Sequence, residues 1–218
     1  MPMSEITRKD KERLARKNEI IKAAERIFVQ KGFENSTMDD IAKEAEFTKK
    51  TIYTYFKSKE ELYYELMLVG FKTLNALYDE ALIENVALGE IEKIKKIGYS
   101  FIEFSRNYPG YFKAISDYKT KDFDFEENEN NSLVKDCYFA GEYSFELLRN
   151  CIISGIKKGE ILDKADPNIV CLILWSTMVG ISSLMNKKEK YLNVYFNKGI
   201  EEIMETGFEM LLNSLKKT

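Results

Sequence analysis

The chain has 218 residues, 44% apolar and 32% charged, so it is large enough for one or two soluble domains with a sizeable core. Its 3 prolines and 11 glycines are few, which favours an all-α fold. The absence of histidine excludes Ser-His and Cys-His nucleophile pairs, zinc helices of the His-Glu-x-x-His type and histidine-containing di-iron bundles.

Charge is distributed unevenly along the chain, whose net charge is −3. Residues 1–60 contain 14 Lys and Arg against 11 Asp and Glu, a net +3, whereas the remainder contains 19 against 25, a net −6. A weakly basic N-terminal part on an acidic body predicts an anionic partner for the N-terminal part alone.

The cysteines and the apolar runs predict a cytoplasmic protein. Cys137 and Cys151 lie about 21 Å apart along one predicted helix, too far for a disulfide, and Cys171 also falls in an apolar pattern, so reduced thiols are expected. Residues 1–18 are charged and lack the apolar stretch of a signal peptide. The apolar run 169–185 is short for a membrane span, which favours a core or interface helix and no membrane partner.

Two helices are predicted at the start of the chain. Residues 8–31 have apolar side chains at helical spacing, and Gly32 follows as a stop signal. A second helix, about 37–45, begins with a capping box in which Thr37 is the N-cap and Asp40 occupies the third position.

A third short helix is predicted over 48–56, after a turn at Glu46. Thr48 is its expected N-cap. Three short helices joined by tight turns outline a helix-turn-helix. The third helix begins with Lys49 and Lys50, where the helix dipole disfavours positive charge by about 0.3–1 kcal/mol.

The third helix is predicted to have a buried side and an exposed side. At 100° per residue, Ile52 and Phe56 fall on the buried side. The opposite side and its flanks combine basic, aromatic and hydroxyl groups: Lys49, Lys50, Thr51, Tyr53 and Thr54. Such groups bind phosphate oxygens and base edges, and in the major groove the phosphates outweigh the helix dipole. This interpretation explains the lysine pair better than an ordinary solvated pair does.

Specific residue types recur over this segment at Gly32-Phe33, Thr37, Ile41-Ala42, Ala45, Thr48, Thr51-Ile52-Tyr53, Phe56 and Ser58-Lys59-Glu60. Through them, residues 32–62 closely resemble the N-terminal DNA-binding domain of the Tet repressor (TetR) family of bacterial regulators. The resemblance covers the first quarter to third of the chain, and the remainder is similar to the family in helix number and length only.

The resemblance implies a DNA-binding domain over 1–57 and a ligand-binding and dimerisation domain over 58–218. It implies a ligand-responsive transcriptional regulator, a repressor, that binds double-stranded operator DNA as a homodimer and is released by a small apolar or aromatic effector. The alternatives are a helical interaction module, which leaves the basic face unexplained, and a bundle enzyme, which lacks its usual ligands. No enzymatic activity, catalytic residue, metal site or cofactor is expected.

The resemblance also assigns DNA contacts. Thr37 and Thr48 would cap helices whose N–H groups point at phosphates, and Lys59 matches a phosphate-binding lysine of the family. Tyr55 stands where the family often has a histidine that contacts phosphate. The full expected set is Thr37, Thr48, Lys49, Lys50, Thr51, Tyr53, Thr54, Tyr55 and Lys59.

Two positions depart from the family pattern. Glu46 occupies a turn position that is usually glycine, and a positive φ there would cost about 1–2 kcal/mol. Lys50 replaces another frequent glycine and adds charge and bulk at the groove. The two departures fall in the turn and at the start of the third helix.

Beyond the third helix the pattern predicts further helices and one polar loop. A second capping box at Ser58 and Glu61 opens the fourth helix. The polar loop, 119–131, contains five acids and three asparagines and is expected to be solvated, with an electrostatic gate as the alternative. The predicted helices are 58–84, 90–107, 109–117, 132–158, 166–185 and 189–216.

The last two predicted helices are expected to form the dimer interface, because small and apolar residues recur at helical spacing. The predicted interface residues are Ile173, Gly199, Ile203, Gly207 and Met210. Packing within one subunit is the alternative.

An effector pocket is predicted from aromatic and apolar residues on the body helices, with two carboxylates flanked by apolar residues for a cationic ligand. These residues are Phe101, Glu103, Phe104, Phe112, Tyr138, Glu142, Trp175 and Met178. An ordinary core for the apolar residues and a solvated face for the two glutamates are the alternatives.

Overall fold

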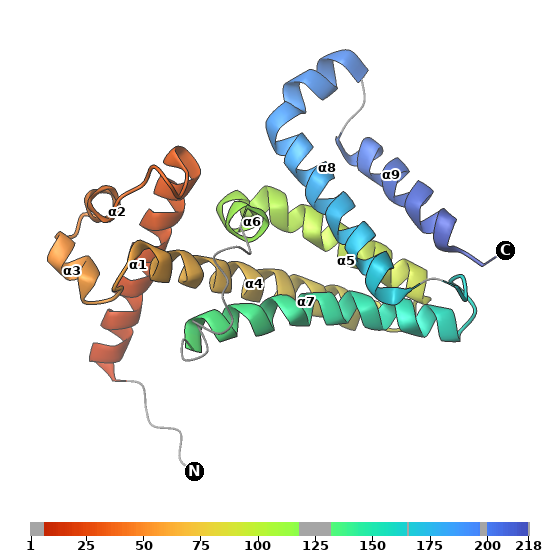
Figure 1. Ribbon diagram of the computed structural model, residues 1–218, viewed down its shortest axis with the longest axis horizontal. Helices are drawn as coiled ribbons and strands as arrows, with labels where there is room; N and C mark the ends of the chain where they lie inside the picture. Colours follow the sequence, from red (N-terminus) through yellow and green to blue (C-terminus); the bar gives the residue numbers. More distant parts are fainter. Residues whose placement is uncertain (1–6, 118–131, 165, 197–199, 218) are drawn as a thin grey trace, which may run out of the picture. The chain divides into compact units, whose positions relative to one another are not determined.

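The computed structural model describes residues 7–117, 132–164, 166–196 and 200–217, and these residues form helices (Figure 1). The predicted all-α class is confirmed. The helices are α1 Arg8–Lys31, α2 Met38–Glu44, α3 Lys49–Tyr53, α4 Lys59–Glu84, α5 Glu90–Asn107, α6 Pro109–Ser116, α7 Ser132–Lys157, α8 Pro167–Phe196 and α9 Ile200–Leu215. The predicted loop 119–131 lies outside the described residues.

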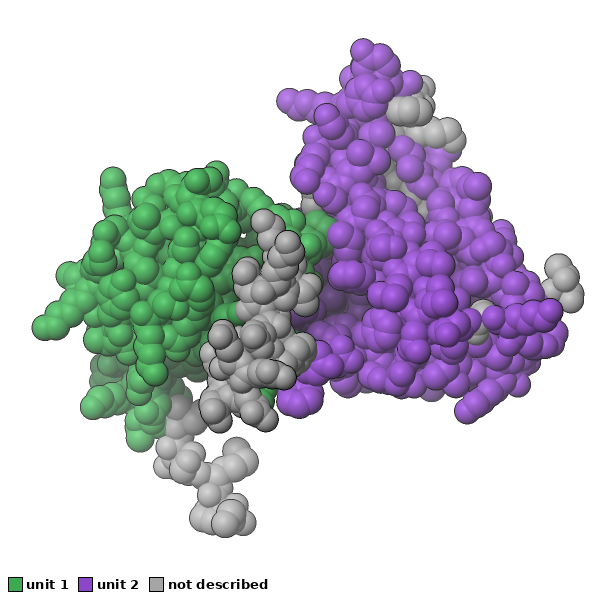
Figure 2. Space-filling view, in the orientation of Figure 1, with its two compact units in different colours: residues 1–70, 109–137 green, residues 71–108, 138–218 purple. Residues whose placement is uncertain are grey.

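Packing divides the chain into two compact units (Figure 2). Unit 1 comprises residues 1–70 and 109–137, and unit 2 comprises residues 71–108 and 138–218. The helix-turn-helix therefore belongs to the same unit as α6. The boundary expected between residues 57 and 58 divides the chain by function and not by packing, and it stays a prediction.

Unit 1 is built around the apolar face of α1. This face includes Ile20, Ala23 and Ala24, whose side chains are fully buried, and α2 and α6 pack against α1. Ile41 of α2 and Ile52 of α3 are also fully buried. The helical spacing of these residues in the sequence thus corresponds to a real core.

Unit 2 contains a close approach of α5 and α9. A Cβ atom on Gly98 would lie 2.0 Å from the Phe208 ring, so only glycine fits beside this buried phenylalanine. The first turn of α5 is closed from a distance, because the Glu160 carboxylate accepts hydrogen bonds from the backbone N–H groups of Glu90 (2.7 Å) and Ile91 (3.3 Å). A carboxylate that follows the C-terminal end of α7 therefore fulfils the role that a local N-cap usually has.

A buried carboxylate, Glu90, lies beside this cap. Its side chain is 6% exposed and accepts hydrogen bonds from Lys158 at 2.6 Å and Lys93 at 3.3 Å. Burial alone would raise the pKa of Glu90, but the hydrogen bonds from Lys158, Ser154 and Lys93 outweigh it and lower the pKa below the ordinary value. The ionised carboxylate is therefore part of the native packing.

All three cysteines are buried free thiols. Burial raises the pKa of Cys151 to about 11 and that of Cys171 to about 12. Cys137 directs its thiol to the carbonyl oxygen of Tyr64 at 3.1 Å.

The predicted break between 185 and 189 is wrong, since α8 continues to Phe196. The residues at the predicted break, Asn186-Lys187-Lys188, are polar, but lysine is a good helix former and neither Gly nor Pro interrupts them. At these residues the loss of apolar character marks a polar stretch within the helix and not its end. α3 is also shorter than predicted, ending at Tyr53 with Thr54 as its C-cap.

Candidate nucleic-acid interface

The turn between α2 and α3 has the geometry expected of a helix-turn-helix, but with a strained residue. Glu46 has φ +57°, in the left-handed region that favours glycine. Its N–H donates to Lys43 O (3.2 Å), and Phe47 N–H donates to Ala42 O (3.0 Å), which together form a Schellman motif. The turn therefore adopts a conformation that favours glycine although Glu46 carries a side chain.

Capping fixes where α2 and α3 begin. Thr37 Oγ1 accepts from the N–H of Asp40 at 3.1 Å, and the Asp40 carboxylate accepts from the Thr37 N–H at 3.0 Å, as the predicted capping box requires. Thr48 Oγ1 accepts from the N–H of Thr51 at 3.1 Å. Both threonine hydroxyls are occupied within their own helices, so a phosphate at these sites would be bound by the remaining backbone N–H groups.

The α3 helix has the predicted buried and exposed sides. Ile52 is fully buried and Phe56, just after the helix, is 1% exposed. Tyr53 is 47% exposed, and Lys49, Lys50 and Thr54 are exposed, whereas Thr51 and Tyr55 are half-buried. The exposed group combines two cations, a phenol and a hydroxyl, which is the chemistry that reads phosphate and base edges.

The two lysines of α3 have different surroundings. Lys49 Nζ forms an ion pair with Asp39 Oδ2 of α2 at 2.9 Å, and this hydrogen bond raises the pKa of Lys49. Lys50 has no carboxylate within ion-pair distance in the part of the chain that the structure describes. The sequence did not reveal the pairing of Lys49, because it depends on how the turn folds α3 back towards α2.

Lys59, the predicted phosphate contact, has partners within the protein. Its half-buried ammonium donates to the carbonyl oxygens of Phe33 (2.7 Å) and Ser36 (3.1 Å) and lies 4.2 Å from the centre of the Phe33 ring. These contacts tether the α1–α2 turn to the start of α4. Lys59 has these partners because the carbonyl groups of the α1–α2 turn point at the first residue of α4.

The start of α4 has only part of the predicted capping box. Ser58 Oγ accepts from the N–H of Glu61 at 3.1 Å, but the Glu61 carboxylate accepts from the N–H of Lys57 instead of that of Ser58. The helix still begins where the sequence predicts.

The predicted effector residues are divided between the two units and between buried and exposed positions. Phe101, Phe104 and Met178 are buried in unit 2, with the two phenylalanine ring centres 6.5 Å apart, whereas Phe112 belongs to unit 1. The other four are exposed: Glu103, Tyr138, Glu142 and Trp175. Helical spacing alone did not distinguish the inner face of a helix from its flank.

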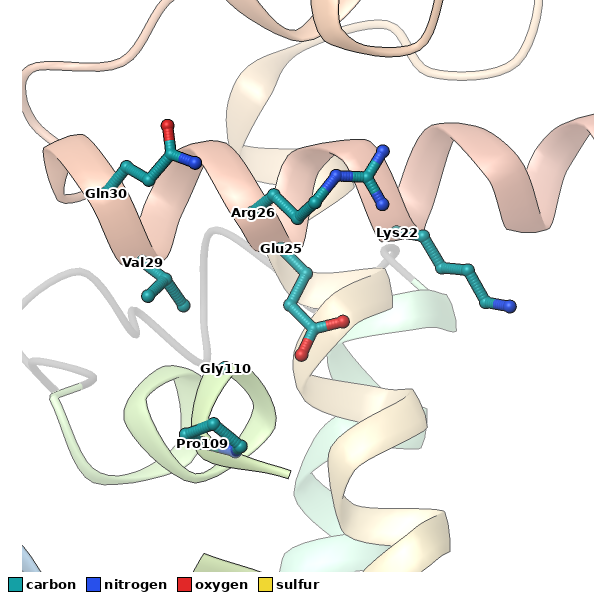
Figure 3. Close-up of a pocket in the computed structure, with 7 residues that line it drawn as sticks. All are labelled: Lys22, Glu25, Arg26, Val29, Gln30, Pro109 and Gly110. Carbon is teal, nitrogen blue, oxygen red and sulfur yellow. The ribbon is translucent and has the colours of Figure 1, made fainter. Parts of the chain in front are cut away.

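The structure has a cavity in unit 1, at α1 and the first turn of α6 (Figure 3). It measures about 340 Å³, and none of the predicted effector residues lines it. Glu25 and Val29 point from α1 towards Pro109 and Gly110 (Figure 3). The lining residues are Lys22, Glu25, Arg26, Val29, Gln30, Pro109 and Gly110.

Glu25 controls how closely α1 and α6 approach at this cavity. A Cβ atom on Gly110 would lie 2.3 Å from Glu25 Cγ, so the Glu25 side chain occupies the space that glycine leaves. Burial raises the pKa of the Glu25 carboxyl, an effect that Arg26 and Lys22 reduce.

Four of the five predicted dimer residues lie on α8 and α9. Ile173 is 50% exposed and Met210 is 69% exposed, whereas Ile203 and Gly207 are half-buried and Gly199 lies outside the described residues. Within α8, Pro167–Met185 is long and apolar enough to cross a membrane by length and composition, and 33% of its most apolar window is buried. Further exposed apolar residues of α8 are Ile169, Leu172, Trp175, Leu184, Tyr191, Val194 and Tyr195.

Comparison with known proteins agrees with this geometry. The family model for bacterial regulatory proteins of the tetR family matches residues 20–66. YhgD, an HTH-type transcriptional regulator of Bacillus subtilis, is 28% identical over 169 residues, which cover 76% of this chain and 82% of that protein. IcaR of Staphylococcus aureus, the negative transcriptional regulator of the biofilm operon icaADBC, is 37% identical over 59 residues, 27% of this chain and 32% of that protein.

A solved structure extends the likeness over the remaining helices. The regulator FadR of Bacillus subtilis, in complex with stearoyl-CoA, aligns with a TM-score of 0.69 and 18% identity over 89% of this chain and 97% of that chain. At this identity the likeness concerns the fold. The family model thus identifies the helix-turn-helix segment, residues 20–66, as that of the TetR family of bacterial regulatory proteins, and the solved structure shares the fold of the remaining helices.

Proposed function

We propose that this protein is a transcriptional repressor that binds operator DNA as a homodimer and is released by a small lipophilic effector. The division of labour is the one expected from the sequence, with residues 1–57 binding DNA and residues 58–218 binding the effector and the second subunit. DNA binding places its action in the cytoplasm.

The observation that carries this proposal is the chemistry of the exposed side of α3. Buried Ile52 and Phe56 anchor the helix, and the opposite side presents Lys50 without an ion-pair partner among the described residues and Tyr53 at 47% exposure. A short helix anchored in this way, following a tight turn, is the element that enters a major groove. We propose that the direct contacts to DNA come from the exposed α3 residues and Tyr55. Lys59 stabilises the turn between α1 and α2 through its hydrogen bonds to Phe33 and Ser36.

The dimer is proposed to form through α8 and α9. Their exposed apolar residues include Ile173, Leu172 and Met210, each at least half exposed, which is unusual for the surface of a soluble monomer. A second copy would cover them in an isologous interface. Dimeric readers require half-sites about 34–36 Å apart, so the dimer also sets the operator spacing.

The effector is proposed to be a lipophilic molecule bound by the body. FadR, which shares the fold, has been solved with stearoyl-CoA. The buried aromatic residues Phe101 and Phe104 of unit 2 offer apolar surroundings of the kind that such a ligand needs. A ligand releases DNA only if it binds the released state more tightly than the DNA-bound state.

The test begins with footprinting of the purified protein on DNA flanking its own gene, with light scattering at micromolar concentration to measure the dimer. Lys50→Ala should then weaken operator binding, with a shallower salt dependence if Lys50 contacts phosphate, or relax discrimination at one base by about 1–3 kcal/mol if it contacts a base. Lys157→Ala, which removes an exposed lysine of α7 outside both proposed interfaces, is the matched control. Equal affinity and equal specificity in both variants would refute α3 as the recognition element.

A further inference from the structure

The first part of α1 lies outside the core of unit 1. Residues 7–16 are all exposed, and the buried side of the helix begins at Ile20. A helical segment of about ten residues is unstable alone in water, but this one continues into the anchored remainder of α1 (Figure 1). It also begins with a complete capping box of Thr7 and Asp10. Residues 8–16 therefore present a helical surface that the core does not require.

This segment is strongly basic. Residues 8–16 contain five Lys and Arg against two Asp and Glu, a net +3, which equals the whole net charge of residues 1–60. Both acids are engaged within the segment, Asp10 in the capping box and Glu12 with Arg8 at 2.9 Å. Among the described residues, no carboxylate lies within ion-pair distance of the four other cations, which are Lys9, Lys11, Arg13 and Arg16.

Three of these four cations lie on one side of α1. At 100° per residue, Lys9, Arg13 and Arg16 fall within about 60° of one another, whereas Lys11 lies on the opposite side. These three residues form the basic stripe. It extends about 10.5 Å along the helix axis, and the phosphates of one DNA strand follow one another at about 3.4 Å along the duplex axis. The length of the stripe therefore corresponds to about three phosphates.

The basic stripe continues the side of α1 that faces the helix-turn-helix. The same line along the helix passes through Ile20 and Ile27, which are buried, and ends at Lys31. Lys31 forms an ion pair with Asp40 of α2 at 2.5 Å, so α2 lies on this side. Before Ile20 the core no longer covers this side, and the stripe is open to a partner that also contacts the helix-turn-helix.

We propose that the basic stripe is a second DNA-binding surface, whose three cations bind backbone phosphates beside the groove that α3 enters. The inference rests on the proposed function and extends it to a segment outside residues 20–66, which the family model matches. Affinity for a duplex depends on the number of phosphates that cations neutralise. Within the helix-turn-helix, Lys49 is paired with Asp39, and Lys59 is bonded to two carbonyl groups. The stripe supplies three cations that have no such partner.

The composition of the segment favours a duplex over a membrane surface. A helix that lies in a membrane interface needs a continuous apolar side of large residues. The apolar residues of 8–16 are Leu14 and Ala15, which are adjacent in sequence and so lie about 100° apart around the helix. Cations therefore dominate the surface, and backbone phosphate is the anion that the neighbouring helix-turn-helix brings close to it.

The test compares Lys9→Ala with Lys11→Ala on the footprinted operator and on a scrambled duplex of equal length, over a range of salt concentrations. Each variant removes one exposed lysine, and the two differ in the side of α1 that they alter. For Lys9→Ala we expect roughly fivefold weaker binding to both duplexes at about 0.15 M salt and a log–log salt slope shallower by about 0.9. Lys11→Ala should change affinity by less than about twofold. Equal losses in the two variants would show that only the net charge of the segment matters, which overturns the inference.

A triple variant, in which Lys9, Arg13 and Arg16 are all replaced by Ala, enlarges the effect. We expect roughly hundredfold weaker binding at about 0.15 M salt and a salt slope shallower by about 2.7. The ratio of operator affinity to scrambled-duplex affinity should stay constant, because phosphate contacts carry no sequence information. A loss confined to the operator would mean that the stripe contacts bases, and unchanged binding would mean that it contacts no DNA. Either result overturns the inference while the proposed function stands.

Two further measurements separate DNA contact from folding. Alanine is the strongest helix former and the three residues are exposed, so the helix content and the thermal midpoint of the triple variant should not fall below those of the wild type. A lower midpoint would show that the stripe stabilises the fold, which overturns its assignment to DNA. The double variant Arg13→Lys, Arg16→Lys keeps the charge and should keep the salt slope. Failure of the wild-type protein to bind any duplex in a salt-dependent manner would instead refute the proposed function.

Discussion

The hydrogen bonds that cap the helices of the helix-turn-helix in unit 1 join residues that are close in sequence, whereas the cap of α5 in unit 2 joins residues that are far apart in sequence. In the first, Thr37 bonds to Asp40 and Thr48 to Thr51, three residues apart. In the second, Glu160 caps a helix 70 residues away. Local hydrogen bonds therefore define the DNA-binding motif, whereas unit 2 depends on packing that only the complete fold creates.

The largest expected effect tests the long-range packing of unit 2. Phe208→Ala should reduce the free energy of unfolding by about 3–5 kcal/mol, because a buried ring is lost and a cavity remains. Gly98→Ala should cost about 1–3 kcal/mol in the wild-type protein, since its Cβ would lie 2.0 Å from that ring. Urea denaturation measures both.

The double variant sharpens this test. Once Phe208 is replaced by Ala, the added methyl group at residue 98 has room. The double variant should therefore lose much less unfolding free energy than the sum of the losses in the two single variants. Additive losses would mean that Gly98 is required for a reason other than the Phe208 ring.

A smaller effect is expected from the buried charge of unit 2. Glu90→Gln should reduce stability at pH 7 by about 1.5–3 kcal/mol, because Lys158 and Lys93 would then donate to a neutral amide oxygen instead of a charged carboxylate. The pKa of Glu90 is lowered in the folded state, so its stabilisation is complete above the unfolded value and is lost as the pH falls through the folded value.

The pH dependence is the control for this variant. As the pH falls from about 6 to about 3, the free energy of unfolding of the wild-type protein should decrease more than that of Glu90→Gln. Other acids titrate equally in the two proteins and cancel in the difference. Parallel curves of unfolding free energy against pH would contradict the role of the ionised carboxylate.

The smallest effect tests the local geometry of unit 1. Glu46→Gly should stabilise the protein by about 0.5–1 kcal/mol, since glycine adopts the positive φ of 57° without steric strain, although its flexible unfolded state offsets part of the gain. Glu46→Ala retains a Cβ atom and serves as the control, with no gain expected. If alanine stabilises as much as glycine, removal of the acid and not relief of backbone strain is responsible.

The same contrast explains what the sequence could predict. The capping residues Thr37 and Thr48 and the buried side of α3 at Ile52 are determined within one or two helical turns, so spacing was sufficient. For Glu46 the family resemblance raised a positive φ only as a condition, and the structure shows that φ is positive there. The caps and the buried side of α3 were predicted without knowledge of any partner elsewhere in the chain.

Other features depend on distant residues and escaped prediction. The resemblance matched Lys59 to a phosphate-binding lysine but did not reveal its partners in the fold, the carbonyl groups of Phe33 and Ser36, more than twenty positions away. Trp175 has the chemistry of a pocket residue but is 45% exposed on α8. In both cases the residue type suggested a role, and the surrounding fold decided which way the side chain points.

The buried thiols have a practical consequence for experiments on this protein. With pKa values of about 11 and 12, Cys151 and Cys171 are almost entirely protonated at neutral pH, and thiolate is the form that reacts with maleimides and oxidants. Cys137 is equally inaccessible, at 2% exposure. A single cysteine introduced on the surface should therefore accept a fluorescent or spin label selectively while all three native cysteines stay in place.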